Sequence, residues 1–226
     1  DFIEHGGTAT GQIGTHTLFT PVSQSGVTGT GTSADPFRVV TTVGVGQTGL
    51  VIEQTDSYVV GDESYRTDVK VTNNGAGAQT GVLYRAGDCF LGASDFGFGF
   101  TETFGTRKAV GCSENASNTP AARILEWVPL TGGNNYHHAQ FNQVWAAIGS
   151  GLPFPDTCRC NEELDNGAGI SWSFSVAPGA EATFSHYTTF SPRGIAGCRP
   201  PRADHRDRLV AELAQCRTQD FRHGRD

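Results

Sequence analysis

The 226-residue chain contains 30 glycines and 10 prolines, and only 17% of its residues are charged. This composition is typical of a turn-rich β protein and argues against a mainly helical one. With a formal net charge of −7, the chain lacks the basic surface that nucleic-acid binding requires. No run of 18 apolar residues occurs, so the sequence predicts no membrane-spanning helix.

Short apolar segments separated by turn residues fill the first part of the chain. Thr17–Thr20, Phe37–Val43 and Gly49–Val60 have the length and β-branched content of strands. The Gly- and Thr-rich stretch 29–36 predicts a loop between the first two. Roughly one strand per 8–12 residues is the spacing of a sandwich or barrel.

A strand–turn–strand pattern follows. Residues alternate between apolar and polar along Thr67–Thr72, the turn residues Asn73–Gly75 come next, and Gly81–Tyr84 is again apolar. Asn and Gly tolerate the positive φ of a tight reversal. The sequence therefore predicts a β-hairpin here.

The same pattern returns later, where Ile170–Val176 leads through Pro178-Gly179 into Ala182–Phe190. The segment TDVKVTNNGAGAQTGVLY resembles the Ig-like repeat domains of bacterial surface proteins, in which a V-x-V-T-N-x-G strand and turn precede an extended strand. The segment SWSFSVAPGAEATFSHYTTF resembles the closing hairpin of such domains, with Val176 in place of their Leu. The resemblance implies a secreted or cell-surface bacterial module.

These patterns predict an all-β, antiparallel β-sandwich over residues 1–192. The long insert between the two hairpins enlarges the sandwich and makes it similar to the supersandwich of sugar-handling proteins. Arg199-Pro-Pro201 ends any strand, and Leu209, Val210 and Leu213 have helical spacing among charged residues. Residues 193–226 are therefore predicted to form a helical or disordered tail.

Two segments of the insert allow two interpretations each. Phe96–Phe100 alternates Phe and Gly, so three Phe side chains share one face of a strand. The bare glycine face either accepts close packing in the core or lines a surface that a ligand approaches. Gln140–Ile148 fits a short helix as well as a strand.

The absence of Met indicates a processed chain or an excised domain. The six cysteines indicate an oxidising compartment. We expect Cys89 to pair with Cys112, closing a loop worth about 3 kcal/mol. Cys158 and Cys160 then pair with each other or cross-pair with the first two. Their spacing is too short for a zinc site, and the seven His form no metal motif.

Calcium is the one cofactor that the sequence leaves open, because carboxylates and amides in loops are its usual ligands. The alternative is that these side chains cap strand ends as Asx turns. The residues concerned are Asp88, Asp95, Asp156, Asp165 and Asn166.

Polar and aromatic side chains are concentrated in the segment Gly132–Gln143, which is predicted as a loop with Asp156 and Asp165 nearby. Sugars bind where an aromatic ring lies beside hydrogen-bonding side chains. The competing interpretation is that the amides bond the backbone of neighbouring loops. The candidate ligand-binding residues are Asn134, Asn135, Tyr136, His137, Gln140 and Asn142.

Three functions remain open. The first is a non-catalytic extracellular module that binds a glycan or a surface protein. The second is a carbohydrate-active enzyme, which requires two acid/base groups across a pocket. The third is a purely structural spacer. The candidate acid/base residues for the second are Glu126, Glu162, Glu163, Asp165 and His186.

Overall fold

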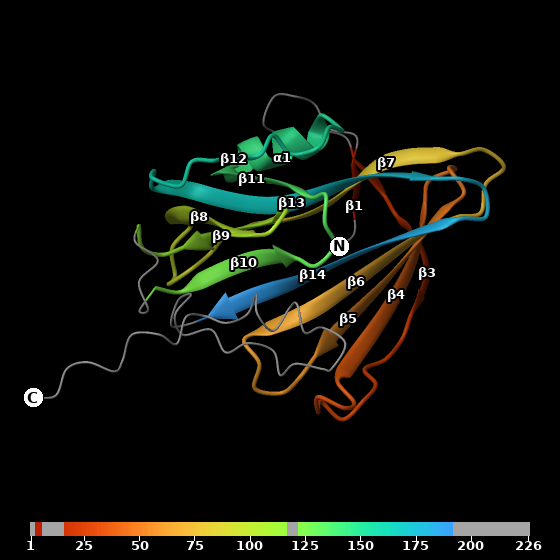
Figure 1. The fold of residues 1–226 in the computed structure, drawn as a ribbon, viewed down its shortest axis with the longest axis horizontal. Helices are drawn as coiled ribbons and strands as arrows, with labels where there is room; N and C mark the ends of the chain where they lie inside the picture. The colour runs from red at the N-terminus through yellow and green to blue at the C-terminus, as the bar shows by residue number, and fades with distance from the viewer. Residues whose placement is uncertain (1–2, 6–15, 117–121, 192–226) are drawn as a thin grey trace, which may run out of the picture.

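The computed structural model describes residues 3–5, 16–116 and 122–191. These residues form strands and one short helix, which confirms the predicted all-β class (Figure 1). The elements are β1 (Ile3–His5), β2 (His16–Leu18), β3 (Thr20–Gln24), β4 (Phe37–Val45), β5 (Leu50–Tyr58), β6 (Ser64–Asn73), β7 (Gln79–Asp88), β8 (Phe96–Phe104), β9 (Arg107–Ser113), β10 (Ile124–Pro129), β11 (Asn135–Gln140), α1 (Phe141–Gly149), β12 (Thr157–Cys158), β13 (Leu164–Val176) and β14 (Glu181–Ser191).

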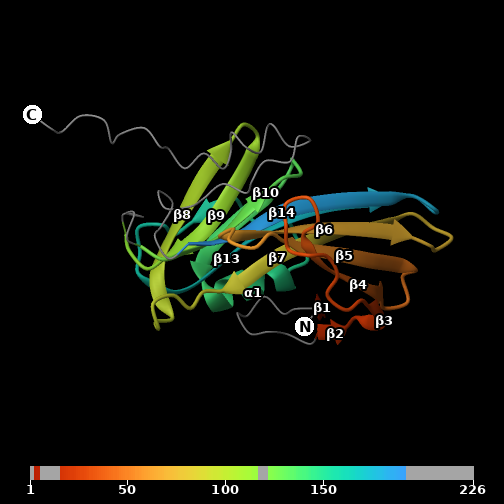
Figure 2. The same cartoon turned by 90° about the horizontal axis from the view of Figure 1, so that it is seen from below.

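A twelve-stranded sheet folds over itself into two layers (Figures 1 and 2). The larger layer has the order β8-β9-β10-β14-β6-β5-β4-β3, and the smaller has the order β7-β13-β11-β12. The layers are continuous where Leu164 and Asp165, at the start of β13, pair with β8. Strands β1 and β2 form a separate pair. The arrangement is the predicted enlarged sandwich.

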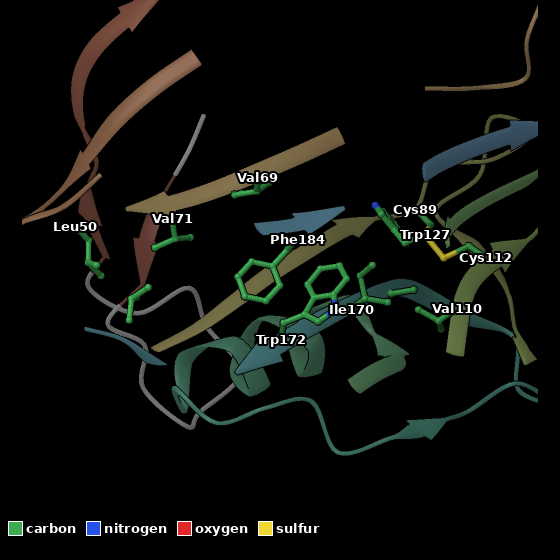
Figure 3. Packing of buried hydrophobic residues seen from close by; sticks show 12 residues of the cluster. Leu50, Val69, Val71, Cys89, Val110, Cys112, Trp127, Ile170, Trp172 and Phe184 are labelled. Atoms are coloured by element: carbon green, nitrogen blue, oxygen red, sulfur yellow. A yellow bond between two sulfur atoms is a disulfide. The ribbon is translucent and has the colours of Figure 1, made fainter. Parts of the chain in front are cut away.

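The hydrophobic core lies between the two layers (Figure 3). Trp172 of β13 contacts Phe184 of β14, with 5.7 Å between ring centroids. Trp127 of β10 is also buried. Both tryptophans therefore contribute to packing, because alternation along their strands points them inward.

A second apolar cluster lies on the outer face of the smaller layer. Helix α1 buries Val144 and Ile148 there, against Ala139 of β11 and Phe154. The ambiguous segment Gln140–Ile148 is therefore helical from Phe141 onward. Its apolar positions four residues apart share one helix face.

Neither predicted hairpin forms. Strand β6 pairs with β5 and β14, whereas β7 pairs with β13, so the two strands flanking Asn73–Gly75 lie in different layers. Strands β13 and β14 are likewise paired with other strands and not with each other. Each strand buries one apolar face, and crossing between layers lets these faces meet in a shared core.

Two connections cross between the layers, one from β6 to β7 and one from β13 to β14. Both are bonded by Asn73, which is fully buried. Its backbone N–H donates to Ala180 O at 3.0 Å, and its backbone carbonyl accepts from Gly179 N at 2.8 Å, both in the connection between β13 and β14. Its side-chain amide donates to Val176 O at 2.9 Å and to Gly77 O at 2.8 Å. Asn73 thus serves both connections, although the sequence predicted only a turn residue.

Replacing Asn73 with alanine is expected to lower the free energy of unfolding by about 2–4 kcal/mol, because buried carbonyl groups lose their donors. Urea unfolding measures the change. Asn74 is exposed, so Asn74→Ala is the matched control and should change stability by less than about 0.5 kcal/mol. Equal effects of the two substitutions would contradict this role of Asn73.

Two disulfides are present. Cys89, directly after β7, is bonded to Cys112 of β9, with 6.4 Å between their Cα atoms. This bond connects the smaller layer to the larger one beside Trp127 (Figure 3). Cys158 and Cys160 are bonded to each other. The structure therefore contains the first pairing expected from the sequence and the uncrossed form of the second.

The predicted tail, residues 193–226, lies outside the described residues. Within the described ranges, no helix combines the length and the apolar character that crossing a bilayer demands.

Candidate functional site

The segment Gly132–Gln143, predicted as a loop, contains strand β11 and the first turn of α1. Strand β11 pairs with β13 along one edge and with the two residues of β12 along the other. Its side chains alternate, so Asn135, His137 and Ala139 share one face and Tyr136 and His138 share the other. The polar residues of this segment therefore do not form one surface.

The structure gives three of the candidate ligand-binding residues different surroundings, and only Asn134 has a clear structural role. Asn134 is buried, and its amide donates to Lys108 O at 2.8 Å. Gln140 precedes α1 without a side-chain capping bond, and the buried Oδ1 of Asn142 has no hydrogen-bond partner among the described residues. For Asn134 the structure matches the competing interpretation, in which amides bond neighbouring backbone.

Asn135 and Tyr136 meet the carboxylate of Asp156. The Asn135 amide donates to it at 2.7 Å, and the backbone N–H of Tyr136 donates at 3.0 Å. The Tyr136 ring is half-buried against the core, and the Lys108 ammonium lies 6.0 Å from its centroid. The aromatic face that we expected to stack on a sugar is thus directed between the layers.

His137 lies on the outer face, next to Asn135. Its Nδ1 is 3.0 Å from the hydroxyl of Thr157, and its ring centroid is 5.8 Å from that of Phe154. Burial lowers the pKa of His137, and a bond involving Thr157 partly opposes this effect. The ring is therefore neutral at pH 7 and can both donate and accept hydrogen bonds.

Arg159 extends this polar surface toward α1. Its guanidinium donates to Gln143 Oε1 at 3.1 Å and forms an ion pair with Glu162. We call the surface the β11–β12 rim; its residues are Asn135, His137, Gln143, Asp156, Thr157 and Arg159. Sequence analysis missed Thr157 and Arg159 because a two-residue parallel strand leaves no periodic signal.

The inner face of β11 shows which interpretation of the Phe–Gly alternation in Phe96–Phe100 is correct. His138 is fully buried, and its Nε2 lies 3.2 Å from the Asn166 amide. A Cβ atom on Gly99 would lie 2.3 Å from its Nδ1. The glycine face thus accepts close packing and does not line a ligand surface. Phe100 is buried as expected, but Phe96 is 58% exposed because it stands at the start of β8.

Gly99→Ala is expected to lower the free energy of unfolding by about 2–3 kcal/mol, because the ring of His138 is too tightly packed to move away. Thermal denaturation with a denaturant series measures this loss. The control is Gly132→Ala, whose new methyl group would meet its nearest atom at 3.9 Å. A stable Gly99→Ala variant would show that β11 can shift away from β8.

Three of the five candidate acid/base residues, Glu126, Glu162 and His186, are not brought together. Glu126 pairs with Thr189, and His186 pairs with Pro129, three positions further along β10. Alternation places the two side chains on opposite faces of the larger layer. Glu162 is held by Arg159 in the loop before β13. These residues therefore form no acid/base pair across a shared pocket.

The five calcium candidates have other partners or neighbours. Asp156 caps β11, and Asn166 donates to Phe98 O at 3.2 Å. Burial, followed by the charges of Asp165 and Asp95, raises the pKa of Asp88. In the ranges that the structure covers, no three His, Cys, Asp or Glu side chains are grouped so as to hold a metal ion.

No family model and no curated protein sequence matches the chain. Solved structures do match. A variant of the GH36 α-galactosidase AgaA from Geobacillus stearothermophilus, in complex with 1-deoxygalactonojirimycin, has a TM-score of 0.52 at 8% identity, covering 80% of this chain and 29% of that one. The chain shares its fold with part of these enzymes.

Two further structures agree. AgaB from Geobacillus stearothermophilus gives a TM-score of 0.51 at 8% identity, over 82% of this chain and 29% of that chain. The α-galactosidase from Lactobacillus brevis gives 0.50 at 11% identity, over 81% and 28%. The chain thus spans less than a third of the length of these proteins. The likeness is to a large sandwich, and no family model supports the Ig-like repeat resemblance.

Proposed function

We propose that the protein is a non-catalytic carbohydrate-binding module of a bacterial secreted or cell-surface protein, and that its glycan contacts the β11–β12 rim. The observation that carries this proposal is the row of polar side chains along one edge of the smaller layer. Asn135 with Asp156, His137 with Thr157, and Arg159 with Gln143 form successive pairs along this edge.

Paired donors and acceptors of this kind suit the hydroxyl groups of a sugar. Each pair is already oriented by its own hydrogen bond, so little side-chain entropy is lost when a ligand binds. A hydrogen bond to a sugar hydroxyl contributes about 1 kcal/mol net, so binding needs several of them.

Two other observations support the proposal. The fold is shared with part of several α-galactosidases, which act on glycans. The two disulfides are typical of proteins from oxidising compartments, in agreement with secretion or display on a cell surface. The glycan could equally be attached to a surface protein, which would then be the partner.

A glycan array probed with the full chain tests the proposal. The best ligand is then titrated against Asn135→Ala and His137→Ala, and each variant is expected to bind about 5–10-fold more weakly. Asn74→Ala, exposed at the crossing after β6, is the matched control. Unchanged affinity with a lower melting temperature would make the rim structural and place the glycan elsewhere on the protein. Absence of any bound glycan on the array would favour a structural spacer.

A further inference from the structure

A second polar cluster lies between the two layers, away from the β11–β12 rim. Arg85 of β7 is half-buried, and its guanidinium donates to the hydroxyl of Tyr65, on β6, at 2.8 Å. Its buried Nε has no hydrogen-bond partner among the described residues. No ion pair joins Arg85 to a carboxylate in the described ranges. A guanidinium in this position is unusual, because buried charges are normally paired.

The strands facing Arg85 contribute three more buried polar atoms without a partner among the described residues: Trp127 Nε1, His186 Nδ1 and Thr188 Oγ1. Thr188 pairs with Trp127 of β10 on one side and with Tyr65 on the other, so these side chains share a face. His186, two positions earlier on β14, shares it as well.

Strand β7 lies directly over this face. A Cβ atom on Gly87 would be 2.9 Å from the ring of Trp127, and Arg85 points to the same side as Gly87 because it is two residues away. The residues of this Arg85 cluster therefore come from four strands and both layers; they are Tyr65, Arg85, Trp127, His186 and Thr188.

The cluster is rich in donors and short of acceptors. The guanidinium and the indole N–H only donate, and the Thr and Tyr hydroxyls can donate. Burial and then the charge of Arg85 lower the pKa of His186 to about 3, so His186 is neutral and Arg85 is the cation.

Carboxylates on the neighbouring strands are already engaged. Asp56 accepts from Thr67 at 2.6 Å and from Gln54 at 2.8 Å. Asp68 is bonded to Arg66, with Nε 2.8 Å from Oδ2. Neither Asp56 nor Asp68 is therefore free to serve as the anionic partner of Arg85.

We propose that the Arg85 cluster is a binding site for a carboxylate group, carried by an acidic sugar or a small organic acid. The planar guanidinium can hold both oxygens of a carboxylate, with the hydroxyl of Tyr65 as an additional donor. Arg85 and Tyr65 are half-buried whereas Trp127, His186 and Thr188 are buried. The ligand would therefore approach from the side of Arg85 and Tyr65, with the other three residues beneath it.

Calorimetric titration of the full chain tests this site. Galacturonate and glucuronate represent acidic sugars, acetate and citrate represent organic acids, and galactose is the neutral control. We expect at least one carboxylate to bind at millimolar concentration and galactose not to bind at this site. Binding by the uronates alone identifies an acidic sugar, and binding by acetate or citrate identifies an organic acid. Absence of any carboxylate binding would overturn the proposal.

Variants locate the binding. Arg85→Gln is expected to weaken carboxylate binding at least tenfold, whereas Arg38→Gln, at an exposed arginine of β4, should leave it unchanged. Arg85→Lys keeps the positive charge but lacks the paired N–H donors of the planar guanidinium, so it too should bind about tenfold more weakly. It replaces the Gln variant if that variant does not fold. Wild-type affinity in every folded Arg85 variant would show that the carboxylate binds elsewhere.

The melting temperature with and without ligand distinguishes a ligand-binding role of Arg85 from a purely structural one. The ligand should raise the melting temperature of the wild type and of Arg38→Gln, but not that of Arg85→Gln. The same ligand-dependent rise in all three proteins would overturn the assignment. Because neither Arg85 nor Tyr65 belongs to the β11–β12 rim, Asn135→Ala should retain carboxylate binding, which keeps this test independent of the proposed function.

Discussion

Acidification from pH 6.5 to pH 5 is expected to lower the free energy of unfolding by about 3 kcal/mol, about 1.6 kcal/mol from each of two buried histidines. Burial is the main cause that lowers the pKa of His138 to about 4 and that of His186 to about 3. In the unfolded chain both return to about 6.5. As the pH falls below 6.5, the unfolded chain takes up protons first, so stability is lost on the acid side and is complete above pH 7.

Urea unfolding at a series of pH values measures this loss. His138→Gln and His186→Gln each remove one proton-linked group, so each should reduce the slope of stability against pH by about 1.4 kcal/mol per pH unit. The double variant should remove most of the dependence between pH 5 and 6.5. A slope that is the same in wild type and double variant would show that neither histidine is responsible.

Trp172→Ala is expected to cost about 3–5 kcal/mol, the usual range for removing a buried aromatic residue. Trp172 is 1% exposed and stacks on His186 with 6.2 Å between ring centroids. Its indole N–H donates to Thr131 O at 3.1 Å, so the substitution also removes the partner of a carbonyl group. The cavity would lie in the middle of the core (Figure 3).

Chemical denaturation at neutral pH measures this cost. Trp172→Phe is the informative comparison, because it keeps one aromatic ring and much of the apolar volume but removes the indole N–H. Its cost should be well below that of alanine. Equal costs for the two variants would indicate that the hydrogen bond to Thr131, and not packing, dominates at this position.

Alternation along the chain was enough to predict most strands of the sandwich, since it directly records which face is buried. It did not predict their partners. The residues around Asn73 and around Gly179 are of the types that form hairpin turns. The connections that contain them, β6 to β7 and β13 to β14, nevertheless cross between layers. Local turn residues permit a reversal, but the apolar faces of the flanking strands decide whether those strands pair side by side or pack face to face.

The candidate site was predicted in part for a similar reason. Asn135 and His137 were identified by their residue types, and the structure places both on the β11–β12 rim. Asn134 has the same chemistry but is buried against Lys108. Arg85 was missed because nothing in its own segment shows that Tyr65 and His186 face it across the sandwich. Contacts between layers have no periodic signature in a single sequence.

The crossing residue Asn73 also constrains the order of folding. Its side chain bonds Val176, 103 positions later in the chain, and its strand lies between β5 and β14. While the chain is being synthesised, one edge of β6 has no partner until β14 has been made. Contacts this distant in sequence make folding slow, and the open edge of β6 is a place where unfinished chains can pair with one another. Refolding at increasing protein concentration should therefore lose yield to aggregation before β14 docks.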